Sequence, residues 1–230
     1  EDHKLSPSLF DAAWLERERA SMEISCRQAA PYHPPAYTLG DENYLAREGI
    51  EVDLSPENVA AFKVWLREQY PGIEALNAVW KTSYGDFDAI ESPMLMEEAA
   101  QQTTSFAPWF DFRTFMDTAF ADLHETMAGF VRAEDPAAKV GWDGFLRNHW
   151  LAGYDFYKLT RNLELNQVYT SCPLQGELVR SFKRADALTG EWGNAIADTE
   201  AGFSAITWHN LFRGHNSAWW WTSWGCDYIP

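Results

Sequence analysis

The chain has few cysteines and no long apolar run, and each shortage excludes a class of protein. Its three cysteines, Cys26, Cys172 and Cys226, are too few and too scattered along the 230 residues for a disulfide framework or a metal knuckle. We expect buried thiols and no metal. No apolar run reaches the roughly 18–20 residues of a membrane span, so no membrane association is expected.

Basic residues are also scarce. The chain has 18 Lys and Arg against 34 Asp and Glu, which gives a net charge of −16. Nucleic acids need clustered Lys and Arg, and anionic membrane surfaces need the same, so both are disfavoured as partners. A neutral ligand fits this charge better.

The first residues, 1–4, are charged, no apolar signal core follows them, and the chain lacks an initiator Met. We therefore expect mature or excised material of a soluble protein, with the compartment, cytoplasmic or secreted, left open. Motifs for nucleotide, phosphate, serine-nucleophile and zinc-protease sites (G-x-G-x-x-G, G-x-x-x-x-G-K, G-x-S-x-G and H-E-x-x-H) do not occur in the sequence, and no cofactor is expected.

Two short apolar segments that end in a glutamate stand out from this background. Residues 36–42 read Ala-Tyr-Thr-Leu-Gly-Asp-Glu, and residues 185–193 read Ala-Asp-Ala-Leu-Thr-Gly-Glu-Trp-Gly. Each pattern predicts a buried strand that leaves a sheet at its carboxyl end, where parallel α/β folds place their reactive groups. Glu42 and Glu191 are therefore candidate catalytic residues.

The rest of the chain alternates between helical and strand patterns. Helical spacing is found at 9–29, 56–70, 73–80, 109–133, 154–159, 176–183 and 199–212. Strand patterns are found at 36–41, 139–142, 165–170, 185–191 and 217–221. This order predicts a parallel α/β sheet of five strands with helical crossovers in one domain over 1–230. An excursion at about 71–105 interrupts the alternation, and a long loop of this kind is usually functional.

Two carboxyls at strand ends that the fold brings together suit the hydrolysis of a glycosidic bond. One must hold a proton for the leaving oxygen, while the other must be ionised to trap an oxocarbenium-like centre. The 12 tryptophans agree with a carbohydrate ligand, because a sugar ring presents a flat C–H face to an indole. We expect core packing to account for about half of these rings.

The segment from Phe62 to Tyr84 resembles a known family. Its pattern, F-x-x-W-L-x-x-x-Y-x-x-I-x-x-L-N-x-x-W-x-T-x-Y, is similar to the segment after the acid/base strand in family 42 glycoside hydrolases, the β-galactosidase-type enzymes of the retaining (β/α)₈ clan. The run from Gly190 to Gly193 resembles the nucleophile strand of that clan, and Trp219–Trp224 its eighth strand.

The resemblance implies a retaining β-glycosidase on a (β/α)₈ TIM barrel. It implies that Glu42 is the acid/base, Glu191 the nucleophile and Tyr169 a hydrogen-bond donor to that nucleophile. Sugar contacts are expected from Asp41, Asn43, Trp142, Trp192, Trp221 and Trp224, with an oligo- or polysaccharide as substrate. It also implies that the five strands are strands four to eight, so that the sequence is part of a longer enzyme, and it is compatible with a homo-oligomer.

Two departures from the family pattern affect this interpretation. The family has Asn immediately before the acid/base, where this chain has Asp41, with Asn43 following Glu42. Such a carboxylate would raise the proton affinity of Glu42 or bind a different hydroxyl pattern. Many relatives carry a cysteine cluster for zinc after this strand, and this chain has none.

Three alternatives stay open at this point. A carbohydrate-binding or catalytically degenerate barrel would keep the aromatic cleft without productive geometry. A structural α/β domain would carry the two glutamates by coincidence. Glu200 is the reserve carboxyl should Glu191 face away, although an acidic first turn of the helix near Thr199 explains it as well. His209 and His215 are more typical of satisfied or solvated histidines than of metal ligands.

Overall fold

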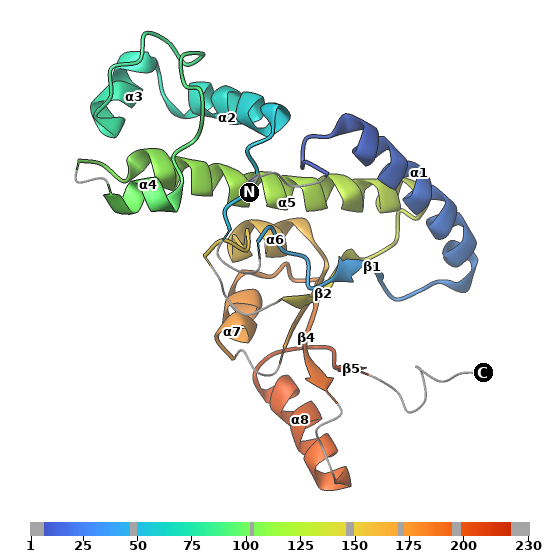
Figure 1. The fold of residues 1–230 in the computed structure, drawn as a ribbon. Coiled ribbons are helices and arrows are strands. Elements are labelled where there is room, and N and C mark those ends of the chain that lie inside the picture. Colours follow the sequence, from blue (N-terminus) through green and yellow to red (C-terminus); the bar gives the residue numbers. More distant parts are fainter. Residues whose placement is uncertain are drawn as a thin grey trace. The chain divides into compact units, whose positions relative to one another are not determined.

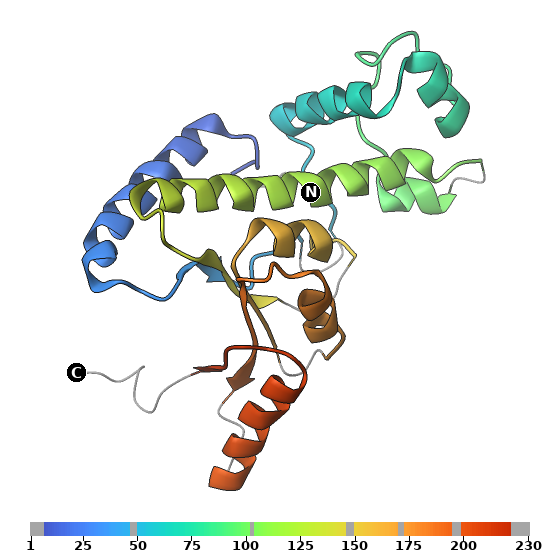
Figure 2. The ribbon, with the colours of Figure 1, turned by 180° about the vertical axis from the view of Figure 1, so that it is seen from behind.

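The computed structural model describes residues 7–46, 50–101, 104–145, 150–169, 173–194 and 199–221. The chain forms two compact units, which helices α1 (Ala12–Ala29) and α5 (Ala107–Glu134) both enter. One unit contains residues 1–18, 45–123 and 150–154, and the other contains 19–44, 124–149 and 155–230. Figure 1 and the reverse view in Figure 2 show the elements of each unit.

The first unit is helical. It contains α2 (Pro56–Gln69), α3 (Ile73–Trp80) and α4 (Met96–Gln101) with the amino-terminal parts of α1 and α5. Helix α2 begins as predicted, because the Ser55 hydroxyl accepts a hydrogen bond from the backbone N–H of Asn58 at 3.3 Å and Pro56 occupies the first turn. The fully buried ring of Phe62 lies 5.3 Å from Phe112 and 5.2 Å from Phe115, centroid to centroid, which ties α2 to α5.

The second unit contains a parallel sheet of five strands. These are β1 (Tyr37–Asp41), β2 (Val140–Phe145), β3 (Leu165–Tyr169), β4 (Leu188–Asn194) and β5 (Trp219–Trp221). Each strand pairs only with its neighbours in chain order, β1-β2-β3-β4-β5, and every pairing is parallel. The predicted parallel α/β sheet is therefore confirmed. Strand β4 begins and ends three residues later than the predicted range 185–191.

Helices α6 (Phe156–Asn162), α7 (Pro173–Phe182) and α8 (Glu200–Phe212) connect the strands of this sheet, and the short 3₁₀ helix η1 (Ala30–Tyr32) precedes β1. The Asp155 carboxylate caps α6 by accepting from the Lys158 N–H at 3.0 Å, and the Thr199 hydroxyl caps α8 by accepting from the Gly202 N–H at 3.1 Å. Helix α7 packs on β3 and β4. Because every pairing in the sheet is parallel, the carboxyl ends of all five strands lie at one edge.

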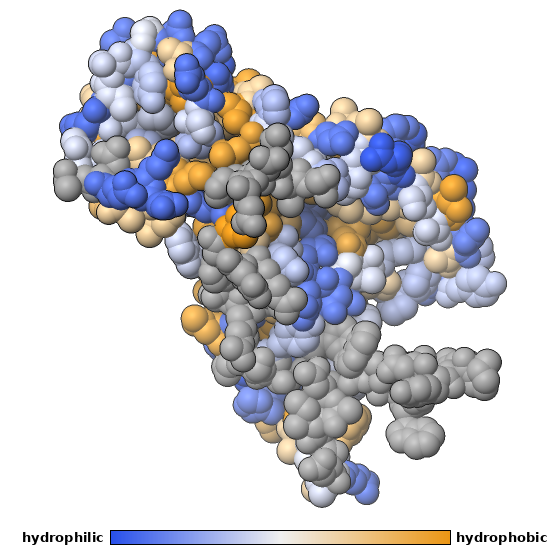
Figure 3. Space-filling view, in the orientation of Figure 1, coloured by the Kyte–Doolittle hydropathy of each residue, from blue (hydrophilic) through white to orange (hydrophobic). Residues whose placement is uncertain are grey.

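Helix α4 lies within the predicted excursion at about 71–105, in a stretch whose sequence has no clear helical period. Its six residues satisfy no long helical period, so tertiary packing around the buried Ala99 decides the conformation. The visible face of α1 is largely hydrophilic in Figure 3. On this helix, Arg19 pairs with Glu23 at 3.2 Å. No helix in the described part of the chain is long and apolar enough to cross a bilayer.

Candidate active site

The carboxyl ends of β1 and β3 meet through a hydrogen bond between their last residues. The hydroxyl of Tyr169 donates to Oδ1 of Asp41 at 3.1 Å. The intervening strand β2 allows this contact through Gly144, which has a φ of +80°. A Cβ on Gly144 would lie 2.1 Å from Oδ1 of Asp41 and 2.9 Å from the Tyr169 hydroxyl, so only glycine fits below the pair.

Glu42 follows Asp41 directly and turns the chain away from the sheet. Its φ of 53° is in the left-handed region, and its N–H donates to the carbonyls of Asp143 and Gly144 at 3.3 and 3.1 Å. Burial raises the pKa of Tyr169 well above its ordinary range, and contacts with Glu42 and Asp41 raise it further. The carboxyls of Asp41 and Glu42 therefore both act on the Tyr169 hydroxyl. The sequence does not predict this, because neighbouring residues in a regular strand face opposite sides.

The pKa of Asp41 is also raised. Burial is the largest cause, and the negative charges of Glu42 and Asp143 add to it, while the hydrogen bond from Tyr169 opposes the shift. A cluster of acidic groups at one strand end favours retention of a proton, which a general acid requires.

Asn43 fixes the turn behind these carboxyls. Its Nδ2 donates to the Leu39 carbonyl at 3.3 Å and contacts Nε2 of His124 on α5 at 3.1 Å. Gly40 has a φ of +134°, and a Cβ there would lie 2.6 Å from Oδ1 of Asn43. In this structure Asn43 thus holds the backbone turn that carries Glu42.

Glu191 lies on β4 as predicted, but its carboxyl is on the other face of the sheet. Trp192 pairs in register with Tyr169, and Glu191 pairs with Val168, one position earlier, so Glu191 and Tyr169 belong to opposite faces. The Glu191 side chain meets the helices, because a Cβ on Gly176 of α7 would lie 3.0 Å from its Oε1.

A partly buried ion pair holds the Glu191 carboxyl there. Its Oε1 lies 2.6 Å from Nη1 of Arg213 and 4.0 Å from Nε2 of His215, and the residue is only 3% exposed. Burial raises the pKa of Glu191, and the Arg213 charge opposes this shift. The structure therefore does not bring Glu191 to Glu42, and Tyr169 donates to Asp41 where a contact with Glu191 was expected.

Trp142 was predicted to contact the sugar, and the structure contradicts this. The residue is 0% exposed, and its ring lies 4.7 Å from His124 and 4.4 Å from Phe145, centroid to centroid. It is the central side chain of the core between β2 and α5. An alternating strand pattern cannot tell which face meets the helices when both faces are apolar.

The other predicted aromatic contacts stay predictions. The backbones of Trp192 and Trp221 belong to β4 and β5, at positions paired with Trp219 and Asn194 respectively. Their side chains, and the whole of Trp224, lie outside the described residues. Arg213 was not among the predicted residues, because the helix dipole alone explains a basic residue directly after a helix and the sequence gives no signal for its carboxylate partner.

A family model for glycoside hydrolase family 42, described as beta-galactosidase, matches residues 41–221. The chain belongs to this family. A beta-galactosidase of an Arthrobacter species is 34% identical over 86 residues, which are 35% of this chain and 12% of that protein. The chain thus spans a small part of the length of that relative.

Solved structures show the same fold. The beta-galactosidase of the haloarchaeon Halorubrum lacusprofundi gives a TM-score of 0.68 at 16% identity, covering 93% of this chain and 36% of that one. The family 42 exo-carrageenase of Bacteroides ovatus gives 0.60 at 17% identity, covering 78% and 29%. These are (β/α)₈-barrel glycosidases, so the five-stranded sheet of this family 42 chain is part of such a barrel.

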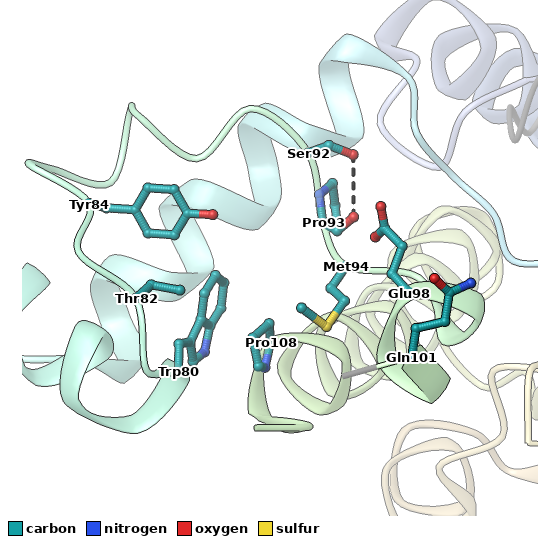
Figure 4. A pocket seen from close by; sticks show the side chains of 9 residues that line it. All are labelled: Trp80, Thr82, Tyr84, Ser92, Pro93, Met94, Glu98, Gln101 and Pro108. Carbon is teal, nitrogen blue, oxygen red and sulfur yellow. Dashed lines mark hydrogen bonds between the residues drawn. The ribbon is translucent and has the colours of Figure 1, made fainter. Parts of the chain in front are cut away.

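The helical unit of the family 42 chain contains a pocket of about 550 Å³ inside the excursion that the sequence marked. Figure 4 shows Trp80, Thr82 and Tyr84 on one side of it, with Glu98 and Gln101 across from them. The lining is completed by Ser92, Pro93, Met94 and Pro108. Aromatic rings together with a carboxylate and an amide suit a small polar ligand.

Hydrogen bonds to residues outside the pocket hold its aromatic side in place. Nε1 of Trp80 donates to Asp111 at 2.7 Å, and the Asn77 side chain holds both the N–H and the carbonyl of Tyr84, at 2.9 and 2.8 Å. Within the residues described, no three His, Cys, Asp or Glu side chains gather as metal ligands would.

Proposed function

We propose that this family 42 chain belongs to a retaining β-glycosidase for neutral galactoside-like sugars, with Glu42 as the acid/base. The observation that supports this most directly is the convergence of Asp41, Glu42 and Tyr169 at the carboxyl ends of parallel strands. An acid/base carboxyl must reach the leaving oxygen of the glycosidic bond, and barrel enzymes place such groups at the carboxyl ends of their strands. The relatives named beta-galactosidase supply the substrate class.

Glu191 is the proposed nucleophile, on the strength of its place in β4 and of the family pattern. Double displacement needs the two carboxyls about 5–5.5 Å apart. The Glu191 carboxyl must therefore reach the Tyr169 face of the sheet, which requires a change in the β4 backbone as well as loss of the Arg213 pair. The proposal thus makes the Arg213 pair an alternative state of the nucleophile.

Covalent trapping tests the assignment. A 2-deoxy-2-fluoro-β-galactosyl fluoride forms a glycosyl-enzyme that persists, and digestion with mass spectrometry identifies the labelled peptide. A label on Glu191 is the expected result. A label on Glu200 would move the nucleophile to the reserve carboxyl, and a turnover-competent protein with no label would contradict the retaining mechanism.

The acid/base role of Glu42 has its own test. Glu42→Gln should slow glycosides with poor leaving groups far more than activated aryl glycosides, because only the former need a proton from the enzyme. Azide should rescue the second step and give a β-azide. Equal losses on both substrate types, without rescue, would give Glu42 a structural role.

A second function is favoured by one observation, the partly buried pair of Glu191 with Arg213. A barrel that holds this carboxyl permanently would bind sugars without hydrolysing them. Binding of galactosides with no turnover and no label from the fluorosugar would establish this function in place of the first.

A further inference from the structure

Three side chains that line the pocket of the helical unit have hydrogen-bond donors that are already engaged. The indole N–H of Trp80 donates to a carboxylate outside the pocket at 2.7 Å. The Thr82 hydroxyl donates to Oδ1 of Asn77 at 2.8 Å. The Ser92 hydroxyl donates to the Pro93 carbonyl at 3.3 Å, along the dashed line in Figure 4. The two hydroxyl oxygens therefore offer lone pairs to a ligand, and their protons are used elsewhere.

The charge of this pocket has one sign. Among the described residues that line it, Glu98 is the one charged side chain, and none is Lys, Arg or His. Its Oε2 accepts a hydrogen bond from the Leu95 N–H at 3.1 Å, whereas its Oε1 has no partner within the described ranges of the chain. The two residues that follow Gln101 in the sequence are Gln and Thr, which add no charge. A cation would therefore find a counter-charge here, and an anion would find none.

Two aromatic rings form a corner of the pocket. The rings of Trp80 and Tyr84 lie 6.4 Å apart, centroid to centroid, with an angle of 79° between their planes. Trp80 is only 4% exposed, and Phe62 lies beside it at 6.4 Å in a stacked arrangement. A sugar ring needs a broad open face for stacking, which so buried an indole lacks, whereas a compact cation needs only a part of a ring face within about 6 Å. Figure 4 shows the Tyr84 hydroxyl pointing across the pocket, toward the side that carries Glu98.

We propose that this pocket binds a small organic cation with a primary ammonium group, of the alkyl diamine and polyamine class. An ammonium group has three donors and no acceptor, which matches acceptor oxygens beside a carboxylate. The methylene stem of the ligand packs on the aromatic corner and on Met94, and the volume of about 550 Å³ is typical of a small-molecule site. None of the residues proposed for catalysis lines the pocket, so this inference is independent of the proposed function.

The class of ligand is tested by isothermal titration calorimetry of the chain with 1,5-diaminopentane and with its uncharged analogue 1,5-pentanediol. The diamine should bind saturably, more weakly as the salt concentration rises, and the diol should bind at least about 10-fold more weakly than the diamine. Methyl β-galactoside, a neutral sugar, should not compete with the diamine. Equal affinity for the diamine and the diol, including no binding of either, or displacement of the diamine by the galactoside would overturn the proposal.

Two neighbouring glutamates of α4 give a matched pair of variants. Glu98→Gln removes the charge but keeps an acceptor for the Leu95 N–H, so it should weaken diamine binding by about 5-fold or more while the helix is retained. Glu97→Gln is the control, because Glu97 is exposed in the same first turn and does not line the pocket. It should leave the affinity nearly unchanged. Equal losses in the two variants would assign the effect to the general charge of the unit and would overturn the proposal.

The aromatic corner has a separate test at Tyr84. Tyr84→Leu removes the ring and should weaken diamine binding by about 3-fold or more, whereas Tyr84→Phe keeps the ring face and should weaken it less. The Asn77 side chain holds Tyr84 through its backbone N–H and carbonyl, and both variants keep these two hydrogen bonds. Thermal unfolding of each variant checks the fold. A Tyr84→Leu variant with the stability and the diamine affinity of the wild type would contradict the proposed site.

Discussion

Arg213 and the buried Glu191 form a partly buried ion pair, with Nη1 2.6 Å from Oε1, on the helix-covered face of β4. The arginine follows α8 and the glutamate lies in the strand, so the pair fastens that helix to the sheet. Burying two charges is costly, and removal of one partner leaves the other without compensation.

Glu191→Gln should therefore lower the free energy of unfolding by about 3 kcal/mol, the lower end of the range for a broken buried pair, because Arg213 retains a second carboxylate, Glu177, at 3.4 Å. Urea denaturation measures the change. Glu177→Gln is the control, with a side chain 44% exposed, and it should destabilise the protein much less than Glu191→Gln. Equal losses in the two variants would show that the Glu191 carboxyl is not held by Arg213.

His215 should make stability depend on pH. Burial, helped by the charge of Arg213, lowers its pKa from 6.5 to about 4, so the unfolded chain binds a proton at a higher pH than the folded one. The stabilisation is complete above pH 6.5 and is lost as the pH falls toward about 4, by an amount on the order of 3 kcal/mol. The difference in unfolding free energy between wild type and His215→Asn, measured across this interval, should carry that slope. The exposed His33, changed to Asn, should not alter it.

Gly144→Ala should disrupt the Asp41–Tyr169 contact. The added Cβ meets Oδ1 of Asp41 and the backbone keeps a positive φ, so we expect a loss of stability of about 1–3 kcal/mol. Gly129→Ala in α5, where nothing lies within 4 Å of the new Cβ, should instead gain up to about 1 kcal/mol. Thermal unfolding of both variants measures these changes in stability, and titration of Tyr169 reports on the contact with Asp41. A Gly144→Ala variant as stable as the wild type would falsify the described packing.

Trp142→Ala should act on folding. Removal of a fully buried ring should cost about 3–5 kcal/mol, since the cavity between His124 and Phe145 cannot close. Trp208→Ala, at a residue 57% exposed on α8, is the control and should cost far less. Should the Trp142 variant stay stable but lose sugar affinity, the sugar contact first predicted for this ring would be restored.

Much of this architecture was readable from local signals. The cap at Ser55, with Pro56 behind it, and the alternation of periods gave the helices and the five parallel strands. What could not be read was which face each strand residue presents. Strands covered on both faces are apolar throughout, so Trp142 and Glu191 were assigned to the ligand side when their contacts are with helices.

The same limit applies to Asp41 and Glu42. Neighbours in a regular strand face opposite ways, and only the positive φ of Gly40 and Glu42 lets both carboxyls act on Tyr169. Such a backbone irregularity depends on the contacts around it. Asn43 and Gly144 lie at those contacts, and neither residue belongs to a sequence pattern that is typical of a catalytic site.

The strictly sequential strand order has a consequence for how the protein folds. The pairings β2-β3, β3-β4 and β4-β5 each close a loop of one helical crossover, whereas β1 must wait for the whole stretch from 42 to 139, with α2–α5, before Tyr37 meets Val140. Closing a long loop costs chain entropy before the contacts across it can form. The sheet should therefore grow from β2 to β5 and receive β1 last. The strand that carries Glu42 would then be the final one to dock, and hydrogen exchange during refolding should protect its amides after those of β3.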